Sequence, residues 1–179
     1  MAMAEELFDV VDELGRVIGQ APRSRCHGDP TLIHQAVHVL VFDRQGRLFL
    51  QKRSAAKDIQ PGKWDTSVGG HMKPGEKPLE AAQRELAEEL GRKLLRLDFA
   101  YQYIWHSPVE TELIRSYVVL DEGPFTLQAE EIDEGRFWHF DEIKASLGDD
   151  TFTPQFQHEF PRMEEWWRRH QAGMTHFTR

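Results

Sequence analysis

Three glutamates stand close together in the segment 78–90, and their spacing would let them bind one metal ion. Glu85, Glu88 and Glu89 occupy positions i, i+3 and i+4, so on a helix their carboxylates would share one face. Like charges in this arrangement repel each other and do not stabilise a helix. A divalent cation such as Mg²⁺ makes the arrangement favourable, because it prefers oxygen ligands and keeps positions open for water and phosphate. The alternative for these residues alone is an acidic helix face in contact with solvent.

The sequence around these glutamates predicts the helix that would position them. Pro78 suits the first helical turn, where its missing N–H costs nothing, and Gly91 suits the residue just past the end. A glycine-rich turn that begins at Gly69 precedes this helix. Offsets of three, four and four predict one apolar stripe facing the core, made of Leu79, Ala82, Leu86 and Leu90.

A longer pattern surrounds the three glutamates. Gly70 is followed by five residues, Glu76, seven residues, and then Arg84-Glu85-Leu86-x-Glu88-Glu89-x-Gly91. This pattern resembles the Nudix box of the Nudix hydrolases position by position. One departure is Arg92, where the family usually places an aliphatic residue. That position concerns packing, so the departure affects the loop after the helix and not the chemistry.

The resemblance implies roles for individual residues. Glu85, Glu88 and Glu89 would bind Mg²⁺ or Mn²⁺, which lowers the pKa of an attacking water and neutralises phosphate charge. Glu88 or Glu89 would act as general base, and the sequence does not choose between them. Arg84 would orient a glutamate through an ion pair on the helix. Glu76 would do the same from the Nudix loop that begins at Gly70, or would bind the metal through water.

The segment from His27 to His71 resembles the isopentenyl-diphosphate isomerase branch of the same superfamily. The resemblance rests on the spacing of His27 and His34, on Pro61-Gly62-Lys63-Trp64, and on Ser67-Val68-Gly69-Gly70-His71. In that branch a divalent metal is held by three histidines and by two later glutamates spaced Glu-x-Glu. The matching positions are all filled here, by His27, His34, His71, Glu110 and Glu112. The resemblance thus implies a second metal site, where imidazole and carboxylate suit Mn²⁺ or Zn²⁺ better than Ca²⁺.

Single histidines are more often surface or hydrogen-bonded residues than metal ligands. We therefore interpret three others, His38, His106 and His139, as structural. Three basic residues stand where the isomerases place cations against the substrate diphosphate, namely Arg23, Arg53 and Lys57. Each of them alone could equally be a solvated surface charge.

Gly69 separates the chain from the isomerases. Those enzymes carry a cysteine at this position, which acts on the carbon skeleton of the substrate, and Cys26 lies far away in sequence. We therefore interpret the chain as a metal-dependent hydrolase of phosphoric anhydride bonds, which cleaves a nucleoside diphosphate linked to a group X or a related organic diphosphate. The alternatives are an unusual isomerase and a non-catalytic diphosphate-binding or regulatory protein. The group X would be selected by loops, and Trp64, Tyr103, Trp105 and Phe152 could either contact it or belong to the core.

The composition is that of a soluble globular protein. The chain has 179 residues, of which 40% are hydrophobic and 29% charged, and its formal net charge is −8. This negative charge argues against binding to nucleic acid polymers. Its single cysteine suits a reducing compartment, and no signal peptide or membrane span is visible, so we expect a cytoplasmic location. We expect a monomer or a homodimer.

Strands and helices alternate in mixed order, which predicts an α/β sandwich with a central mixed sheet, and the Nudix resemblance implies the same fold. We expect a hairpin and loop over residues 1–30, packed on a Nudix domain of residues 31–179, as one globular domain. Expected strands cover two parts of 7–20 and the segments 36–42, 47–51, 64–68, 97–105, 113–120 and 134–140. Besides 78–90, expected helices run from Asp141 as cap to about Leu147, and onward from Pro154.

Overall fold

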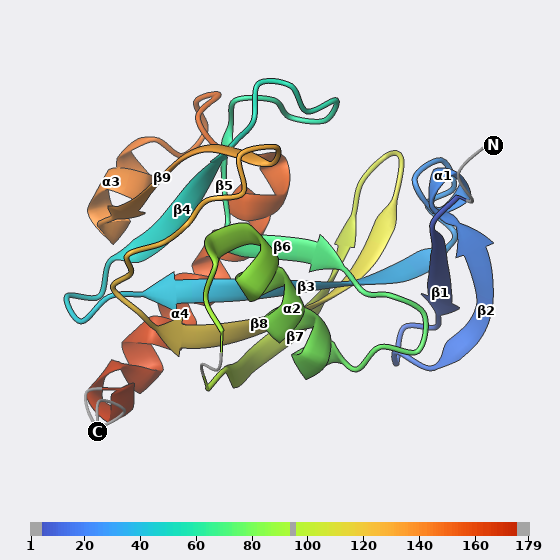
Figure 1. Ribbon diagram of the computed structural model, residues 1–179, viewed down its shortest axis with the longest axis horizontal. Helices are drawn as coiled ribbons and strands as arrows, with labels where there is room; N and C mark the ends of the chain where they lie inside the picture. The colour runs from blue at the N-terminus through green and yellow to red at the C-terminus, as the bar shows by residue number, and fades with distance from the viewer. Residues whose placement is uncertain (1–4, 94–95, 175–179) are drawn as a thin grey trace.

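The computed structural model describes residues 5–93 and 96–174. Within them the chain forms a large mixed sheet with helices on both sides (Figure 1). The strands are β1 Leu7–Val11, β2 Val17–Pro22, β3 Ile33–Phe42, β4 Leu48–Arg53, β5 Trp64–Asp65, β6 Val68–His71, β7 Asp98–His106, β8 Thr111–Leu120 and β9 Ile132–Trp138. The helices are α1 Arg23–Cys26, α2 Pro78–Leu90, α3 Phe140–Ala145 and α4 Pro154–Met174.

The sheet is assembled around β3. This strand pairs in parallel with β8 along the whole length of both, and antiparallel with β1, β4 and β6. Further strands add outward, β2 to β1, β5 and β9 to β4, and β7 to β8. The predicted α/β fold with a central mixed sheet is therefore confirmed.

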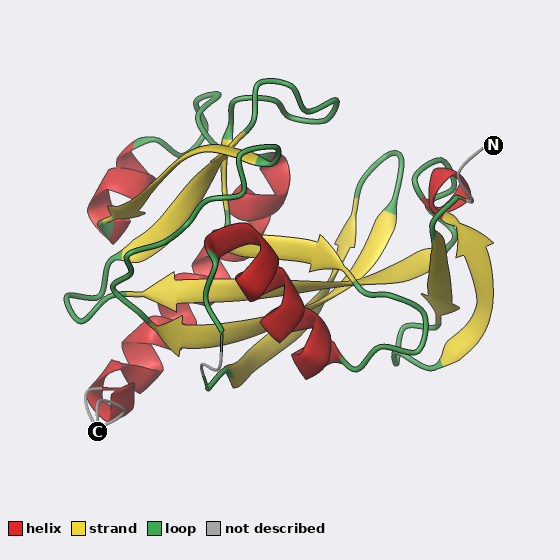
Figure 2. Cartoon of the chain, viewed as in Figure 1, coloured by secondary structure: helices red, strands yellow, loops and turns green. Residues whose placement is uncertain are grey.

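Alternate residues of β3 face opposite sides of the sheet, as the period of two requires. Val37, Val39 and Val41 are buried in the cluster that contains the apolar residues of α2. Leu40 and Phe42 are buried in the cluster that contains those of α4. Figure 2 shows α2 in front of the sheet and α4 behind it. Odd-numbered positions of β3 therefore face α2, and even-numbered positions face α4.

The long helix α4 is amphipathic, as its sequence predicts. Phe156, Phe160 and Met163 are buried against the sheet, and Trp167 stacks on Phe42 with ring centroids 4.4 Å apart. Within the described part of the chain, no helix is long and apolar enough to cross a membrane.

Three sequence predictions about local structure are wrong in detail. The segment 64–68 is two strands, β5 and β6, which pair with different partners. Leu79 is 42% exposed, because the buried face of α2 is rotated toward Glu85 and Glu89. The cap of α3 is His139, whose backbone N–H is bound by the side chain of Glu142, and the predicted cap, Asp141, lies in the first turn.

Candidate active site

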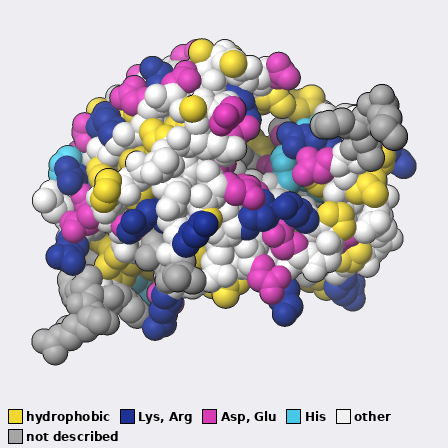
Figure 3. Space-filling model, viewed as in Figure 1, with side chains coloured by type: hydrophobic (Ala, Val, Ile, Leu, Met, Phe, Trp, Pro, Cys, Tyr) yellow, Lys and Arg dark blue, Asp and Glu magenta, His cyan; other side chains and the backbone are white. Residues whose placement is uncertain are grey.

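One cleft of about 770 Å³ joins the two groups of residues that the sequence singles out. His27 and His71 line one part of it, and Glu85, Glu88 and Glu89 of α2 line another. On the face seen in Figure 3, the surface is hollowed beside histidine and acidic side chains. The two candidate metal sites therefore open into a single space.

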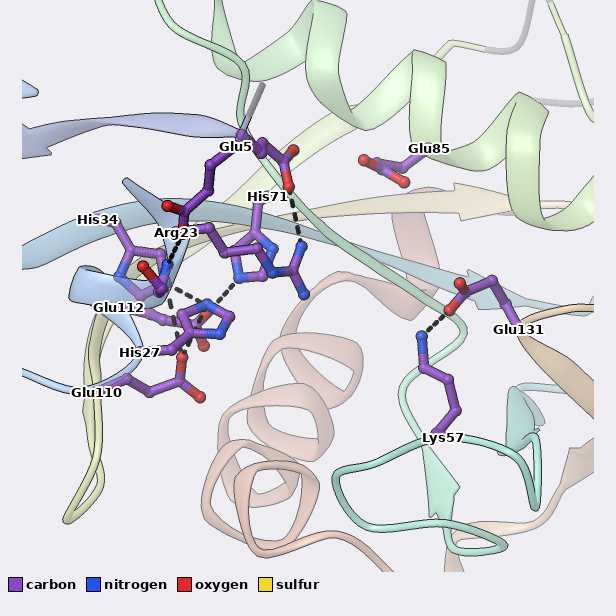
Figure 4. Close-up of polar contacts among 12 residues, drawn as sticks. Glu5, Arg23, His27, His34, Lys57, His71, Glu85, Glu110, Glu112 and Glu131 are labelled. Carbon is purple, nitrogen blue, oxygen red and sulfur yellow. Dashed lines mark hydrogen bonds and ion pairs between the residues drawn. The ribbon is translucent and has the colours of Figure 1, made fainter. Parts of the chain in front are cut away.

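Three histidines and two glutamates converge at one end of this cleft (Figure 4). One potential ligand atom from each of His27, His34, His71 and Glu110 lies within 4.8 Å of the others. Oε1 of Glu112 lies 3.1 Å from Nε2 of His71 and 3.5 Å from Nε2 of His34. The fold positions them from β3, from the ends of α1 and β6, and from the start of β8. It thus brings together all five residues of the predicted second metal site.

Several polar atoms of this cluster fit a metal ion. Nε2 of His27, both ring nitrogens of His34 and Oε2 of Glu110 are buried without a hydrogen-bond partner in the described residues. Burial, together with His71 and His34, lowers the pKa of His27 to about 4, so its lone pair is free near neutral pH. Unpartnered buried polar atoms are costly. A divalent cation bound by these nitrogen and oxygen atoms would satisfy them.

We expect the purified protein to hold about one Mn²⁺ or Zn²⁺ per chain after dialysis without chelator. Protons compete with the metal for imidazole, so the bound fraction should drop as the pH is lowered toward about 5. Elemental analysis measures both. His27→Gln should lose the ion, whereas His170→Gln, at an exposed position of α4, should keep it. Equal metal content in the two variants, or none in the reconstituted protein, would contradict this assignment.

Arg84 organises the acidic helix. Its guanidinium donates to both carboxylate oxygens of Glu76, at 2.8 and 3.0 Å, and to Oε1 of Glu85 at 2.5 Å. It also donates to Oε2 of Glu88 at 3.3 Å and to the carbonyl of His71 at 3.1 Å. The arginine therefore ties the helix to the preceding loop and to the end of β6. This contact pattern agrees with an orienting role for Arg84 and Glu76.

The carboxylate of Glu85 lies directly against the backbone of Gly70. A Cβ added at Gly70 would stand 2.2 Å from Cδ of Glu85, closer than any real contact. Gly70 pairs with Val37 of β3, so this position faces α2. The first glycine of the box thus leaves the space that the carboxylate of Glu85 occupies.

Glu89 is the most deeply buried of the three box glutamates. Its Oε2 accepts a hydrogen bond from Nε2 of Gln51 at 2.8 Å and a longer one from the backbone N–H of Gly69 at 3.4 Å. Burial, with a further contribution from the charge of Glu85, raises the pKa of Glu89 to about 8. Burial raises the pKa of Glu85 as well. A cation bound here would stabilise the charged forms of both carboxylates. Their burial therefore favours a metal site at this position.

The three predicted diphosphate-binding residues, Arg23, Arg53 and Lys57, all line the cleft. Each also has a carboxylate partner, which is Glu6 for Arg23 at 3.0 Å, Asp65 for Arg53 at 3.6 Å, and Glu131 for Lys57. Figure 4 shows Lys57 and Glu131 paired away from the histidine cluster, and Arg23 beside it. These cations surround the cleft rather than meeting at one point.

Sequence reasoning missed Gln155 and the partner of His38. Nε2 of Gln155, at the start of α4, donates to Oε2 of Glu112 at 2.6 Å. His38 forms a buried pair with Glu159 of α4, Nδ1 to Oε2, at 2.6 Å. The signal for the second was present, because His38 interrupts the apolar run 36–42 and Glu159 lies inside the apolar stripe of α4.

Residues 32–169 match the family model described as the NUDIX domain. The chain belongs to the Nudix family. An uncharacterised Nudix hydrolase of Yersinia pestis is 39% identical over 153 residues, which cover 83% of this chain and 80% of the relative. An isopentenyl-diphosphate Δ-isomerase of Streptomyces avermitilis is 36% identical over 156 residues, covering 84% of this chain and 79% of the enzyme. Both branches of the Nudix superfamily that the sequence resembles are thus represented.

A solved structure shows the same Nudix fold. A crystal structure of a Deinococcus radiodurans protein matches with a TM-score of 0.77 and 23% identity, over 88% of this chain and 98% of that one. The Nudix family binds small diphosphate substrates, and membership of this family indicates an enzyme.

Proposed function

We propose that this Nudix protein hydrolyses a diphosphate linkage in a nucleoside diphosphate derivative or a related organic diphosphate, with divalent metal ions. The observation that carries the proposal is the shared cleft. The three box glutamates open into the same space as the cluster of three histidines and two glutamates. A diphosphate lying in it would have carboxylate-held cations available on either side and the cations Arg23, Arg53 and Lys57 around it.

The residues of α2 divide the work of such a site. Glu85, Glu88 and Glu89 would hold Mg²⁺ or Mn²⁺, which supplies charge neutralisation on the phosphate oxygens and a more acidic bound water. Arg84, fixed by Glu76, keeps Glu85 in place through its 2.5 Å hydrogen bond. Glu88 or Glu89 accepts the proton released by the attacking water. The water oxygen bonds to phosphorus as the bridging P–O bond of the anhydride breaks. Each of the two products carries one of the phosphoryl groups.

The rival reaction is isomerisation of a prenyl diphosphate. Two observations favour it, the complete set of histidine and glutamate residues at the second metal site and the relatives named as isomerases. Moving a carbon-bound proton requires an acid or base within hydrogen-bond reach of that carbon. Gly69 offers only backbone at the position where the isomerases carry a cysteine. Cys26 is fully buried in the small N-terminal cluster with Phe8 and Val10. Hydrolysis is therefore favoured over isomerisation. The presence of all three box glutamates also argues against a non-catalytic protein.

Two isotope experiments separate these functions. Isopentenyl diphosphate incubated with the protein and Mg²⁺ in deuterated water should gain no deuterium at carbon. A panel of nucleoside diphosphate derivatives in ¹⁸O-labelled water should give a phosphorylated product that carries the label on phosphorus. Rapid deuterium incorporation would overturn the hydrolase. Binding of panel members without label in any product would indicate a binding protein.

A further inference from the structure

A buried ion pair lies beneath the cleft and has no part in the chemistry proposed above. His38 of β3 is 5% exposed and lines the cleft, and Glu159 of α4 is fully buried. Nδ1 of His38 lies 2.6 Å from Oε2 of Glu159. Since even-numbered residues of β3 face α4, this histidine points away from the acidic helix and toward the start of α4.

The surroundings of Glu159 keep both partners charged. The carboxylate accepts hydrogen bonds from Ser116 at 2.6 Å, Tyr101 at 3.0 Å and Tyr103 at 2.9 Å, besides the histidine. Although burial alone would lower it, the pKa of His38 is raised to about 9 by the charge and hydrogen bond of Glu159. Below that pH the imidazole carries a proton on each nitrogen. One of these N–H groups is used by Glu159, and the other is left for a different acceptor.

The second nitrogen of His38 faces the space above Gly69. His38 and Gly69 are directly paired across β3 and β6, so their side chains belong to one face of the sheet. A Cβ at Gly69 would lie 3.1 Å from Cδ2 and 3.3 Å from Nε2 of His38. Glycine thus leaves room for the ring edge at the cleft surface. Across the described residues, nothing hydrogen-bonds to Nε2.

The floor of the cleft around this nitrogen is polar. Asp65 lines it from the end of β5, Thr66 from the β5–β6 connection, and Gln155 from the start of α4. A hydrocarbon group seated here would leave the second N–H of His38 without an acceptor, which is costly for a donor that is largely buried. A hydroxyl or carbonyl oxygen of a bound group would accept this hydrogen bond.

We propose that Nε2–H of His38 donates a hydrogen bond to an oxygen of the group X, so that the protein selects diphosphates whose X bears hydroxyl or carbonyl oxygens over those with a hydrocarbon X. The inference rests on the proposed diphosphate hydrolysis and specifies its substrate class. His38 is thereby a specificity-determining residue, and Gly69 is the residue that gives it access. Sites built to bond a substrate hydroxyl discriminate strongly against analogues that lack it.

Two matched probes test the proposal with Mg²⁺. ADP-ribose carries a five-carbon sugar, and the β-pentyl ester of ADP carries five carbons without oxygen substituents. The wild-type kcat/KM should be at least about 100-fold higher for ADP-ribose. His38→Gln and Gly69→Ala should each lower kcat/KM for ADP-ribose by about 10- to 100-fold more than kcat/KM for the pentyl ester. Gly19→Ala is the control, since nothing lies within 4 Å of its Cβ.

The selectivity ratio separates recognition from a merely structural role, because a loosened fold would reduce activity on both probes together. Circular dichroism identifies a variant that fails to fold, and the other variant then decides. A wild-type ratio near one, or a ratio unchanged in the folded variants, overturns the proposal while hydrolysis itself stands. If neither probe turns over, calorimetric titration of both gives the same comparison, and equal or undetectable affinities overturn it. Absence of hydrolysis across the wider panel would instead remove the proposed function.

Discussion

Glu89→Gln should lower turnover of an accepted diphosphate by about two to four orders of magnitude, as losses of a metal ligand or a general base do. The substitution keeps the size of the side chain and removes its charge. Its carbonyl oxygen can still accept the hydrogen bond that Nε2 of Gln51 donates to Oε2 at 2.8 Å. The fold should therefore survive, and the loss should appear in kcat measured at saturating Mg²⁺.

The matched control lies on the same helix. Glu80 is in the first turn of α2, with a side chain 60% exposed and a 3.8 Å contact to Lys77, and it does not line the cleft. Glu80→Gln removes the same charge and should change kcat by less than about twofold. Equal turnover in the wild-type protein and Glu89→Gln would show that this helix does not bind the catalytic metal.

The box helix could be predicted from the sequence because its information is local. The residues that begin and end the helix and the spacing of its glutamates all lie within one short segment. The loop before the helix belongs to the same segment. The exposure of each glutamate could not be predicted in this way. Glu85 and Glu89 are buried because β6 and β4 pack against them through Gly70 and Gln51. The spacing of residues along a helix does not indicate which strands will pack against it.

The pair of His38 and Glu159 shows a different limit. Its partners are 121 positions apart, and each stands as an isolated polar residue within an apolar pattern. Such residues need a partner when buried, so the sequence could have marked both as members of a buried polar contact. Pairing them requires knowing that even-numbered residues of β3 face α4, which only the sheet topology provides.

Stability without metal should depend on pH through Glu89. Burial raises the pKa of this carboxyl from 4.5 to about 8 in the folded chain, so the folded protein retains a proton that the unfolded chain has released. This contribution to stability is fully present below pH 4.5 and is lost as the pH rises toward 8. With about 1.4 kcal/mol for each pKa unit, the free energy of unfolding should fall by several kcal/mol across this range.

Urea titration in chelator, at intervals from pH 5 to 8, measures this loss in the wild-type protein and in Glu89→Gln. The glutamine has no proton to release, so the variant should become increasingly more stable than the wild-type protein as the pH rises. Mg²⁺ should reverse the order at pH 8, because a cation bound to the folded state alone stabilises the charged carboxylates. In chelator, Glu88→Gln, at a side chain 49% exposed, should follow the wild-type curve. Parallel curves for the wild-type protein and Glu89→Gln, with no response to Mg²⁺, would mean that this carboxyl is solvated and that α2 holds no cation.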